Sequence, residues 1–527
     1  MGVRSILIVD GYNDEPGGLG VPPYIDVYPR LIAGAAWLAD KTVRVDYVTV
    51  DEFRASTVWL RRATSYDLVA FIAGVVVPGR YIAAEPANAE ELMLWGRLLS
   101  RATLAVLLGP AARWGLGLEG GRPAVPPHRF EKAGFLLVRG DAEIFFYEAV
   151  RHGVERARPN AVRSDYRLAD EALVRGSRVI RQHPSYGRNL IVELETYRGC
   201  ARWISGGCSF CVEPLRGRPV QRSPEAIARE AGSLYRWGAR ALRLGRQADI
   251  LVYGSRELGS EEWPRPDPQA LERLLVGIRN AAPGLEVLHI DNVNPGTIAR
   301  YPRESREALR VIVRYHTDGD VAALGVETAD PRVARINNLN ATAEDVLTAV
   351  RIINEVGAHR GPRGLPHLLP GLNFIIGLPG ETRETYRLNR ELLERIMGEG
   401  LLVRRVNIRR VMVIPATRLS RMWRGINPRV EAAARAFVRW TRRVFDRRML
   451  SRIAPPGTIL KSLWVEECRG SYCYARQQGS YPVMVYVPCR LPRGTFLGSV
   501  RVGGVHSPRA LWGTPLPSRG FEYACAL

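Results

Sequence analysis

The chain has 527 residues, 46% of them hydrophobic, which is enough for about three domains with well-packed cores. No stretch approaches the roughly 20 consecutive apolar residues of a membrane span, and the start is too short and strand-like for a signal peptide, so we expect a cytoplasmic protein without membrane contact. The formal net charge of +22 favours an acidic partner such as RNA.

Residues 1–150 predict strands that alternate with helices. The apolar strand-like runs lie at 5–9, 43–50, 67–77 and 104–108, with a helical pattern at 28–38. This alternation is typical of a parallel, doubly wound sheet, so we expect a Rossmann-like domain. The loop at 14–23 follows the first strand, where open α/β sheets bind ligands, but it lacks the Gly-Lys-Ser/Thr of a phosphate-binding loop. Residues 151–188 are polar and arginine-rich, and we expect a connector there.

Residues 189–425 predict a second alternation of strands and helices. The expected strands lie at 190–194, 241–244, 286–290, 321–326, 372–376 and 406–414. Six parallel strands separated by helices suit a partial (βα)6 barrel, whose active site lies at the C-terminal ends of its strands.

Three cysteines follow the first of these strands. Cys200, Cys208 and Cys211 fall within twelve residues and are the only cysteines before residue 468. Three cysteines cannot all pair with one another, and a structural zinc site would have a further Cys or His pair downstream, which is missing. The spacing favours an iron–sulfur cluster, with a zinc site and inert buried cysteines as the alternatives. In a four-iron cubane, three cysteine ligands leave one iron open to a substrate or cofactor.

Residues 426–454 predict a basic amphipathic helix. Its apolar stripe, interpreted as packing, comprises Val430, Ala434, Phe437, Trp440 and Val444. The overlapping segment 404–452 holds fifteen arginines against two acidic residues. A solvated helix face and a nucleic-acid contact are the two interpretations of this excess.

Residues 455–527 predict a small OB- or TRAM-like β-barrel. Short strands at 459–465, 482–487 and 498–502 are separated by Gly and Pro turns. Four further cysteines match no metal-ligand spacing, namely Cys468, Cys473, Cys489 and Cys525. Buried thiols or disulfides are favoured over an auxiliary cluster.

Residues 189–418 resemble the radical S-adenosylmethionine (radical SAM) superfamily. Phe210 precedes the last cysteine, as that family prefers. Further segments follow in family order, namely Leu244-Gly-Arg-Gln-Ala-Asp249, Leu324-Gly-Val-Glu-Thr-Ala-Asp330, Asn337-Asn-Leu-Asn340, Asn373-Phe-Ile-Ile-Gly-Leu-Pro-Gly-Glu-Thr382 and Arg410-Val-Met-Val-Ile-Pro-Ala-Thr-Arg418. One feature departs from the family pattern, because seven residues rather than three separate the first two cysteines. Gly206 and Gly207 would supply the turn for this longer loop, which resembles an archaeal group of radical SAM iron–sulfur oxidoreductases.

The resemblance implies a [4Fe–4S] cluster held by the three cysteines, with S-adenosylmethionine (SAM) on its open iron. An external electron donor would then drive cleavage of SAM to a 5′-deoxyadenosyl radical. By the same analogy, Gly245 faces the methionine end of SAM, Glu327 accepts hydrogen bonds from the ribose, and Gly377 and Ile414 flank the adenine. Asn373 is placed with these cofactor-binding residues. A salt bridge for Glu327 and a plain strand-to-helix turn at Gly377 are the structural alternatives.

Four polar residues at strand ends are the candidates for catalysis, namely His289, Asp291, Gln247 and Asp249. His289 and Asp291 end the third barrel strand on one face and would bind substrate or relay a proton. A core histidine with satisfied hydrogen bonds is the alternative, and the same uncertainty applies to Gln247 and Asp249.

The N-terminal domain resembles the cobalamin-binding domain that precedes many radical SAM barrels. The Asp-x-His-x-x-Gly motif that ligates cobalt in that family is missing, because the first histidine of the chain is His128. Relatives can bind cobalamin without it, so cobalamin and a plain Rossmann-like scaffold both remain open.

The C-terminal part resembles the RNA-binding appendage of tRNA methylthiolating enzymes. Those relatives carry three further cluster-binding cysteines near the N-terminus, and this chain has none before Cys200, which argues against sulfur insertion. We therefore expect a radical SAM enzyme that modifies RNA, with tRNA as the first candidate. The alternatives are a cobalamin-dependent radical methylase or ring-forming enzyme acting on a small metabolite or peptide, and a non-catalytic RNA-binding protein.

Overall fold

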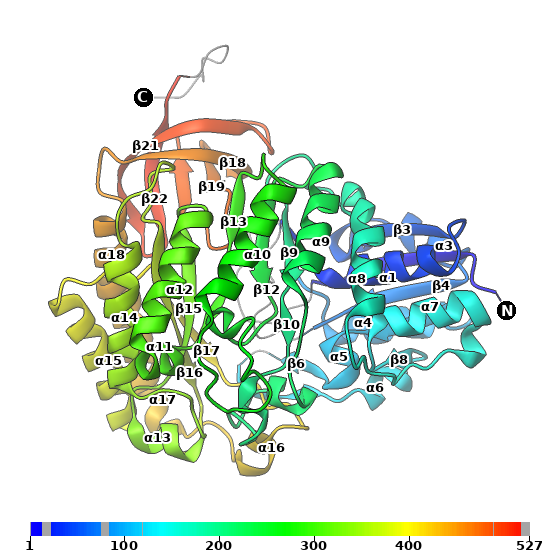
Figure 1. The fold of residues 1–527 in the computed structure, drawn as a ribbon, viewed down its shortest axis with the longest axis horizontal. Coiled ribbons are helices and arrows are strands. Elements are labelled where there is room, and N and C mark those ends of the chain that lie inside the picture. Colours follow the sequence, from blue (N-terminus) through cyan, green and yellow to red (C-terminus); the bar gives the residue numbers. More distant parts are fainter. Residues whose placement is uncertain (1, 13–22, 75–83, 119, 489, 518–527) are drawn as a thin grey trace.

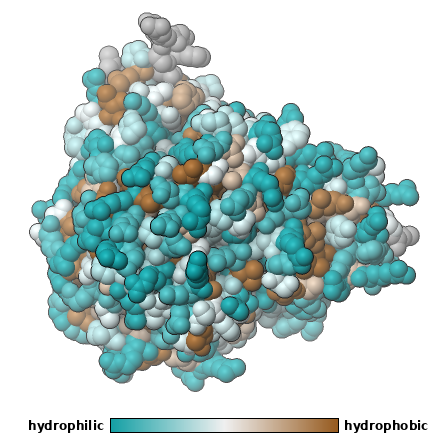
Figure 2. Space-filling view, in the orientation of Figure 1, coloured by the Kyte–Doolittle hydropathy of each residue, from teal (hydrophilic) through white to brown (hydrophobic). Residues whose placement is uncertain are grey.

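The computed structural model describes residues 2–12, 23–74, 84–118, 120–488 and 490–517. An N-terminal sheet with its helices lies beside a central barrel, and a small β-barrel packs on one end of the central barrel (Figure 1). The expected α/β fold with a C-terminal β-barrel is confirmed. Most of the expected ligand loop at 14–23 lies outside the described residues. Within the described ranges, no helix is long and apolar enough to cross a bilayer, and hydrophilic side chains cover most of the face in Figure 2.

The N-terminal sheet is parallel and five-stranded, in the order β3-β1-β4-β5-β8. Its strands are β1 (Ser5–Asp10), β3 (Arg44–Thr49), β4 (Leu68–Ile72), β5 (Leu104–Leu108) and β8 (Leu136–Val138). The strand order reverses between β1 and β4, which is where open α/β sheets form a ligand crevice. Alternate residues of β1 pack into two separate cores, with Ile6 and Ile8 in one and Leu7 and Val9 in the other.

Helices cover both faces of this sheet. They are α1 (Val27–Ala39), α2 (Val50–Ala55), α3 (Thr57–Ala63), α4 (Ala89–Leu99), α5 (Pro110–Arg113), α6 (His128–Glu131) and α7 (Ala142–His152). The segment 151–188, expected to be a connector, contains the further helix α8 (Arg167–Gly176), which packs closely on α1. Two glycines permit this approach, because a Cβ at Gly34 would lie 1.8 Å from the carbonyl oxygen of Ala172, and one at Gly176 would lie 2.0 Å from that of Arg30.

The central barrel is built from two four-stranded sheets, β13-β12-β9-β2 and β14-β15-β16-β17. The strands are β2 (Tyr24–Ile25), β9 (Ile191–Glu195), β12 (Ala241–Gly245), β13 (Val287–His289), β14 (Asn292–Val293), β15 (Asp320–Glu327), β16 (Leu368–Ile376) and β17 (Arg405–Arg410). All of them pair in parallel, and the six expected strands are present. The last strand was expected to reach residue 414 but ends at Arg410, because the chain turns away and Val413 accepts a hydrogen bond from the N–H of Ala124 at 2.9 Å. The two-residue strand β2 comes from the N-terminal part of the chain and pairs with β9 at the edge of its sheet.

The barrel helices begin at clear sequence signals. They are α9 (Pro224–Arg236), α10 (Pro268–Ala281), α11 (Pro295–Arg300), α12 (Pro302–Tyr315), α13 (Pro331–Ile336), α14 (Ala343–Gly357), α15 (Arg383–Gly398) and α16 (Arg418–Met422). Ser223, Asp267 and Asn294 cap helices whose first residue is proline. Proline suits this position because the first helical N–H has no partner within the helix.

The expected basic helix is interrupted by a π-helical turn. It consists of α17 (Pro428–Trp440), a π-helix at Thr441–Asp446, and α18 (Arg447–Ile453). Val430, Ala434 and Phe437 are buried as predicted, but Val444 is 41% exposed, and the neighbouring Phe445 is buried instead. The wider turn inserts an extra residue, which rotates the following side chains. This rotation explains why Phe445 is buried in place of the predicted Val444.

The C-terminal part is a closed five-stranded barrel. Its strands are β18 (Ile459–Arg469), β19 (Tyr472–Gln477), β20 (Met484–Val487), β21 (Phe496–Ser507) and β22 (Ala510–Pro515). The sequence missed β19 and β22, whose outward positions are aromatic or polar and give no continuous apolar run. Cys468 and Cys473 form a disulfide, whereas Cys489 and Cys525 lie outside the described residues.

Candidate active site

A cavity of about 310 Å³ opens at the C-terminal ends of the barrel strands. Seven of the twelve predicted site residues line it, namely Cys200, Cys208, Cys211, Asp291, Glu327, Asn373 and Ile414. They come from segments up to 214 positions apart in the chain (414 − 200), so the fold brings together what the sequence only places at strand ends.

The loop that carries the cysteines is shaped by two glycines. Gly206 and Gly207 have φ angles of +78° and +60°, which glycine adopts without the steric cost that other residues bear. A Cβ at Gly207 would lie 2.3 Å from Cγ of Pro214. The predicted double-glycine turn is therefore confirmed, and it accommodates the long spacing between Cys200 and Cys208.

Residues that follow α13 hold this loop against the barrel. The N–H of Ser209 donates to the carbonyl oxygen of Asn337 at 2.9 Å, and Nδ2 of Asn338 donates to the carbonyl oxygen of Gly207 at 2.9 Å. Arg418 also donates to Gly207, at 2.6 Å. Two of the segments that carry the family resemblance thus position the cysteine loop.

The three thiols fit an iron–sulfur cluster. Each is free of disulfide bonds and lines the same cavity. Burial raises the pKa of Cys200 to about 12 and that of Cys208 to about 11, so thiolates form here only if a metal supplies the compensating charge. Nη1 of Arg202 lies 3.6 Å from Sγ of Cys208, the type of N–H···S contact that tunes cluster potentials.

A single metal ion fits this site less well. In the part of the chain that the structure describes, no three His, Cys, Asp or Glu side chains converge as the ligands of one ion. Each sulfur of a cubane site binds a different iron, so sulfurs spread around one cavity suit a cluster rather than a zinc ion.

Glu327 points into the cavity from a strained backbone. It has a φ of +58° at a register shift where β15 pairs with β16, a conformation that costs free energy for any residue other than glycine. Its Oε1 would lie 2.9 Å from a Cβ at Gly325, so a larger residue there would push the Glu327 carboxylate aside. Burial raises the pKa of Glu327 to about 8, while the charge of Arg409 opposes this shift. Strain kept at a cavity wall is typical of a functional residue.

Gly325 and two asparagines form a row across three adjacent strands. Gly325 pairs with Asn373, and Asn373 pairs with Asn407 on β17. All three line the cavity. Asn373 therefore lies in the same cavity wall as the candidate Glu327, and Asn407 is a further lining residue that alternation within β17 could have indicated.

Gln247 and Asp249 form hydrogen bonds within the fold and do not line the cavity. Oε1 of Gln247 accepts from Thr196 at 3.1 Å, and its Nε2 donates to the carbonyl oxygen of Leu244 at 3.2 Å. The N–H of Leu251 donates to Asp249 at 3.1 Å. Both residues lie at the turn after β12, outside the cavity lining.

Gly245 also lies outside the cavity lining, at the end of β12. The next residue, Arg246, has a φ of +62° and directs its guanidinium towards Glu195 and Asp26. The Arg246 side chain is therefore directed away from the cavity. Ala248 is the residue of this segment that lines the cavity.

His289 and Gly377 hydrogen-bond to residues outside the cavity lining. Nδ1 of His289 accepts from the N–H of Ser480 at 3.0 Å, and burial lowers the pKa of His289 to about 4, so its ring is neutral. The N–H of Gly377 donates to Glu381 at 2.9 Å, and Gly377 lines a separate hollow of about 230 Å³. The strand-to-helix turn predicted as the alternative for Gly377 is thus present.

Tyr481 was missed by the sequence analysis and lines the cavity. It comes from the loop between β19 and β20 of the C-terminal barrel. Its hydroxyl donates to Oδ1 of Asp291 at 2.8 Å, and its ring lies 4.8 Å from the guanidinium of Arg405. Asp291 also forms an ion pair with buried Arg243. The C-terminal barrel therefore contributes a wall of the cavity.

Replacing Tyr481 by phenylalanine is expected to lower the free energy of unfolding by about 1–3 kcal/mol, because Asp291 would lose a donor in a buried setting. Thermal unfolding monitored by circular dichroism would measure it. Tyr472→Phe is the matched control, because that ring is 41% exposed and should lose almost nothing. Equal stability of both variants would show that the Tyr481 hydroxyl does not hold Asp291.

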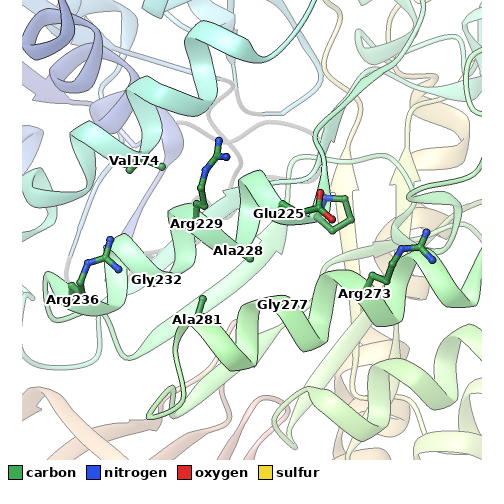
Figure 3. A pocket seen from close by; sticks show the side chains of 10 residues that line it. Val174, Glu225, Ala228, Arg229, Gly232, Arg236, Arg273, Gly277 and Ala281 are labelled. Atoms are coloured by element: carbon green, nitrogen blue, oxygen red, sulfur yellow. The ribbon is translucent and has the colours of Figure 1, made fainter.

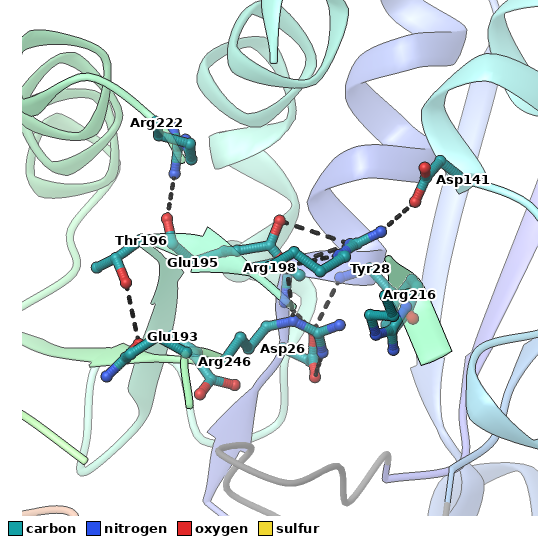
Figure 4. Close-up of polar contacts among 12 residues, drawn as sticks. Asp26, Tyr28, Asp141, Glu193, Glu195, Thr196, Arg198, Arg216, Arg222 and Arg246 are labelled. Atoms are coloured by element: carbon teal, nitrogen blue, oxygen red, sulfur yellow. Dashed lines mark hydrogen bonds and ion pairs between the residues drawn. The ribbon is translucent and has the colours of Figure 1, made fainter. Parts of the chain in front are cut away.

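A buried network of charges joins the N-terminal part to the strand that precedes the cysteines (Figure 4). Glu195, at the end of β9, accepts from Nη1 of Arg163 and Nε of Arg246, both at 3.0 Å, and from the hydroxyl of Tyr166 at 2.8 Å. Arg198 lies 3.1 Å from the same carboxylate. Burial alone would raise the pKa of Glu195, but Arg198, Arg163 and Arg246 outweigh it and hold that pKa well below its usual range.

A second hollow, of about 530 Å³, lies on the outer surface between α9 and α10 (Figure 3). Arg229 and Arg236 on α9 and Arg273 on α10 border it. No strand-end residue lines this hollow, and it therefore takes no part in the site that holds the cysteines.

The fold and the cavity define a barrel enzyme whose three cysteines suit an iron–sulfur cluster with an open iron. Residues 194–393 match the Radical SAM superfamily. The chain is also 42% identical to the uncharacterised protein MJ0274 of Methanocaldococcus jannaschii, over 92% of this chain and 88% of that protein. The chain therefore belongs to the radical SAM superfamily, and it is an enzyme that uses a [4Fe–4S] cluster and SAM.

Two further similarities have lower sequence identity. A tRNA-2-methylthio-N(6)-dimethylallyladenosine synthase of Protochlamydia amoebophila is 25% identical, over 43% of this chain and 48% of that protein. The radical SAM methyltransferase TsrM of Kitasatospora setae, solved with cobalamin and a [4Fe–4S] cluster, has a similar fold. Its TM-score is 0.52 at 17% identity, covering 80% of this chain and 77% of that one.

Proposed function

We propose that this radical SAM enzyme modifies RNA, with tRNA as the first candidate. The observation that carries the proposal is the arginine-rich wall of the cavity. Arg409 and Arg410 line it, and Arg404 and Arg405 precede them in the same segment. Burial, with repulsion from neighbouring guanidinium groups, lowers the pKa of Arg404 and of Arg405 to about 10 each.

Within the segment 404–452, arginines outnumber carboxylates by fifteen to two. Arg410 pairs with Glu431, and Arg442 pairs with Asp446, the two acidic residues of the segment 404–452. Positive charge that is costly to keep half-buried is stabilised by an anionic substrate. A phosphate-bearing polymer that enters the cavity would supply that charge, which supports RNA over an uncharged metabolite.

In this proposal the side chains have separate tasks. Cys200, Cys208 and Cys211 hold the cluster, which when bound supplies the electron that cleaves SAM to a 5′-deoxyadenosyl radical. Glu327 accepts hydrogen bonds from the ribose of SAM, and Tyr481 closes the far wall, so that solvent is kept from the reacting atoms.

The nucleosides of a strain lacking the gene test this proposal. We expect a modified nucleoside to be absent from its tRNA, to return with the wild-type gene, and to stay absent with the Cys208→Ala variant. Mass spectrometry of digested tRNA and of other RNA fractions would measure this. Identical nucleosides in all fractions of the deletion and parental strains would remove RNA as the substrate.

A cobalamin-dependent methylase acting on a small molecule or peptide is the second candidate. It is favoured by the N-terminal sheet, whose strand order leaves a ligand crevice between β1 and β4, and by the fold shared with TsrM. Buried Asp10 ends β1 at this crevice, and burial raises its pKa to about 7. Cobalt analysis of protein produced with added cobalamin separates the candidates, because stoichiometric cobalt would favour the methylase.

A further inference from the structure

Aromatic side chains form a continuous row on the outside of the C-terminal barrel. Tyr474 on β19 pairs with Tyr486 on β20, and Tyr486 pairs with Trp512 on β22. The inward positions beside them, such as Cys473 and Val485, have no exposed surface and fill the barrel. Side chains alternate along a strand, so the row faces outwards.

Two more rings extend this row into a cluster that we call the aromatic face (Tyr472, Tyr474, Tyr486, His506 and Trp512). Ring centroids lie 4.4 Å apart for Tyr474 and Tyr486, 3.9 Å for Tyr486 and His506, and 4.2 Å for His506 and Trp512. Tyr472 lies 5.4 Å from Trp512. Contacts of this kind hold rings in fixed orientations.

The aromatic face remains open to solvent. Tyr472 is 41% exposed and Trp512 is 36% exposed. Cross-strand ring pairs stabilise a sheet, but a barrel that already has a filled interior gains little from a large exposed tryptophan. Rings that are ordered and yet uncovered are what a stacking surface requires.

The charge around the aromatic face is positive. Residues 456–517 contain seven basic side chains and two acidic ones. Both acids have basic partners, since Glu466 pairs with Arg476 and Glu467 pairs with Arg469. Exposed Arg501 lies on β21, beside Thr514 of β22 and two positions from Trp512 along that strand. Phosphate groups at the edge of the face would meet arginine rather than carboxylate.

We propose that the aromatic face binds single-stranded RNA by stacking its bases on these rings. Every base presents a π surface, so the rings bind without requiring one sequence, while nearby arginines contact the backbone. Paired bases are stacked within a duplex and cannot lie on the rings, so the face should prefer unpaired RNA. The proposal rests on the proposed function only in taking RNA as the partner.

The position of the aromatic face links it to the cavity. Tyr474 and Tyr486 belong to the hairpin of β19 and β20, and the loop of the same hairpin carries Tyr481 into the cavity. An unpaired segment held on this hairpin would therefore lie close to the entrance of the reaction site. The face would select unpaired RNA and deliver it to the cavity.

The test measures RNA affinity of the full-length, cluster-loaded enzyme. Fluorescence anisotropy with a labelled oligouridylate would give Kd for wild type, Trp512→Ala and Tyr486→Ala. Each substitution is expected to weaken binding by about tenfold, the size expected for one lost stacking contact. Phe496→Ala is the matched control, because Phe496 is 47% exposed on the same barrel but contacts Trp464 instead. That variant should stay within about twofold of wild type.

The dependence on salt distinguishes stacking from charge. Trp512→Ala should leave the slope of log Kd against log salt unchanged, whereas Arg501→Ala should reduce it by about one. A duplex of the same length should bind more weakly to wild type and be insensitive to Trp512→Ala. Thermal unfolding would confirm that each variant is folded, and Tyr486→Phe should retain most of the affinity because its ring still stacks.

Three results would overturn the inference. The first is equal affinity of Trp512→Ala, Phe496→Ala and wild type. The second is binding of wild type no stronger than binding of an acidic polypeptide control. The third is a monomer–dimer equilibrium that Trp512→Ala abolishes while RNA affinity stays unchanged, which would make the face a contact between copies.

If tRNA nucleosides change in the deletion strain but the first result is obtained, only this inference fails. If RNA binding depends on the face but nucleosides do not change, only the proposed function fails.

Discussion

Cys208→Ala is expected to abolish both iron binding and formation of 5′-deoxyadenosine. The site offers three sulfur ligands around one cavity, and removing one leaves a cubane with two open irons and no further thiol in the lining to replace it. Cys200→Ala and Cys211→Ala should behave alike. Iron content after anaerobic reconstitution, and mass spectrometry of the product after reduction with dithionite, would measure the loss.

The double variant Cys468→Ala/Cys473→Ala is the control for cysteine loss in general. These two residues form a disulfide in the C-terminal barrel, so the variant should keep its iron and its product. The assignment of the ligands would be wrong if this variant lost iron while Cys208→Ala retained it.

Glu195→Gln is expected to lower the free energy of unfolding by about 3–5 kcal/mol, because it removes one partner from a buried charge network. Arg163, Arg198 and Arg246 would then have one carboxylate fewer in a region with almost no solvent. Chemical denaturation at pH 7 would measure the change. Glu399→Gln removes a surface ion pair with Arg351 and should cost no more than about 1 kcal/mol.

The effect of Glu195→Gln should also depend on pH in a defined direction. The pKa of Glu195 is lower in the folded protein than in the unfolded chain, so its stabilising contribution is complete above about pH 4.5 and is lost as the pH falls through the folded value. The difference between wild type and Glu195→Gln should therefore be constant from pH 6 to 8 and shrink in acid. A difference that grew as the pH fell would contradict the proposed network.

The part of the site that the sequence predicted depends on local signals. The cysteine spacing, the glycine pair and the segment from Asn373 are each readable within a few residues. Strand ends were also recoverable, because buried parallel strands produce short apolar runs bounded by Gly or polar residues. Glu327 was identified by its motif, and the structure adds the strained backbone that turns it into the cavity.

The part that the sequence did not reveal depends on contacts between distant segments. The hydroxyl of Tyr481 reaches Asp291 across 190 positions, and Arg246 reaches Asp26 across 220. No local pattern encodes such partners. His289, Gln247 and Asp249 also end strands or follow them, but each hydrogen-bonds to a residue outside the cavity lining, and only the fold distinguishes such a side chain from one that faces a cavity.

The three cysteines are expected to hold a cluster with one iron open to SAM. Electron paramagnetic resonance of the reduced, anaerobically reconstituted wild-type protein would detect this open iron. We predict a [4Fe–4S]⁺ signal whose g values shift when SAM is added, since SAM would become a ligand of the open iron. A folded, iron-loaded protein whose signal is identical with and without SAM would show that SAM does not bind an open iron of this cluster.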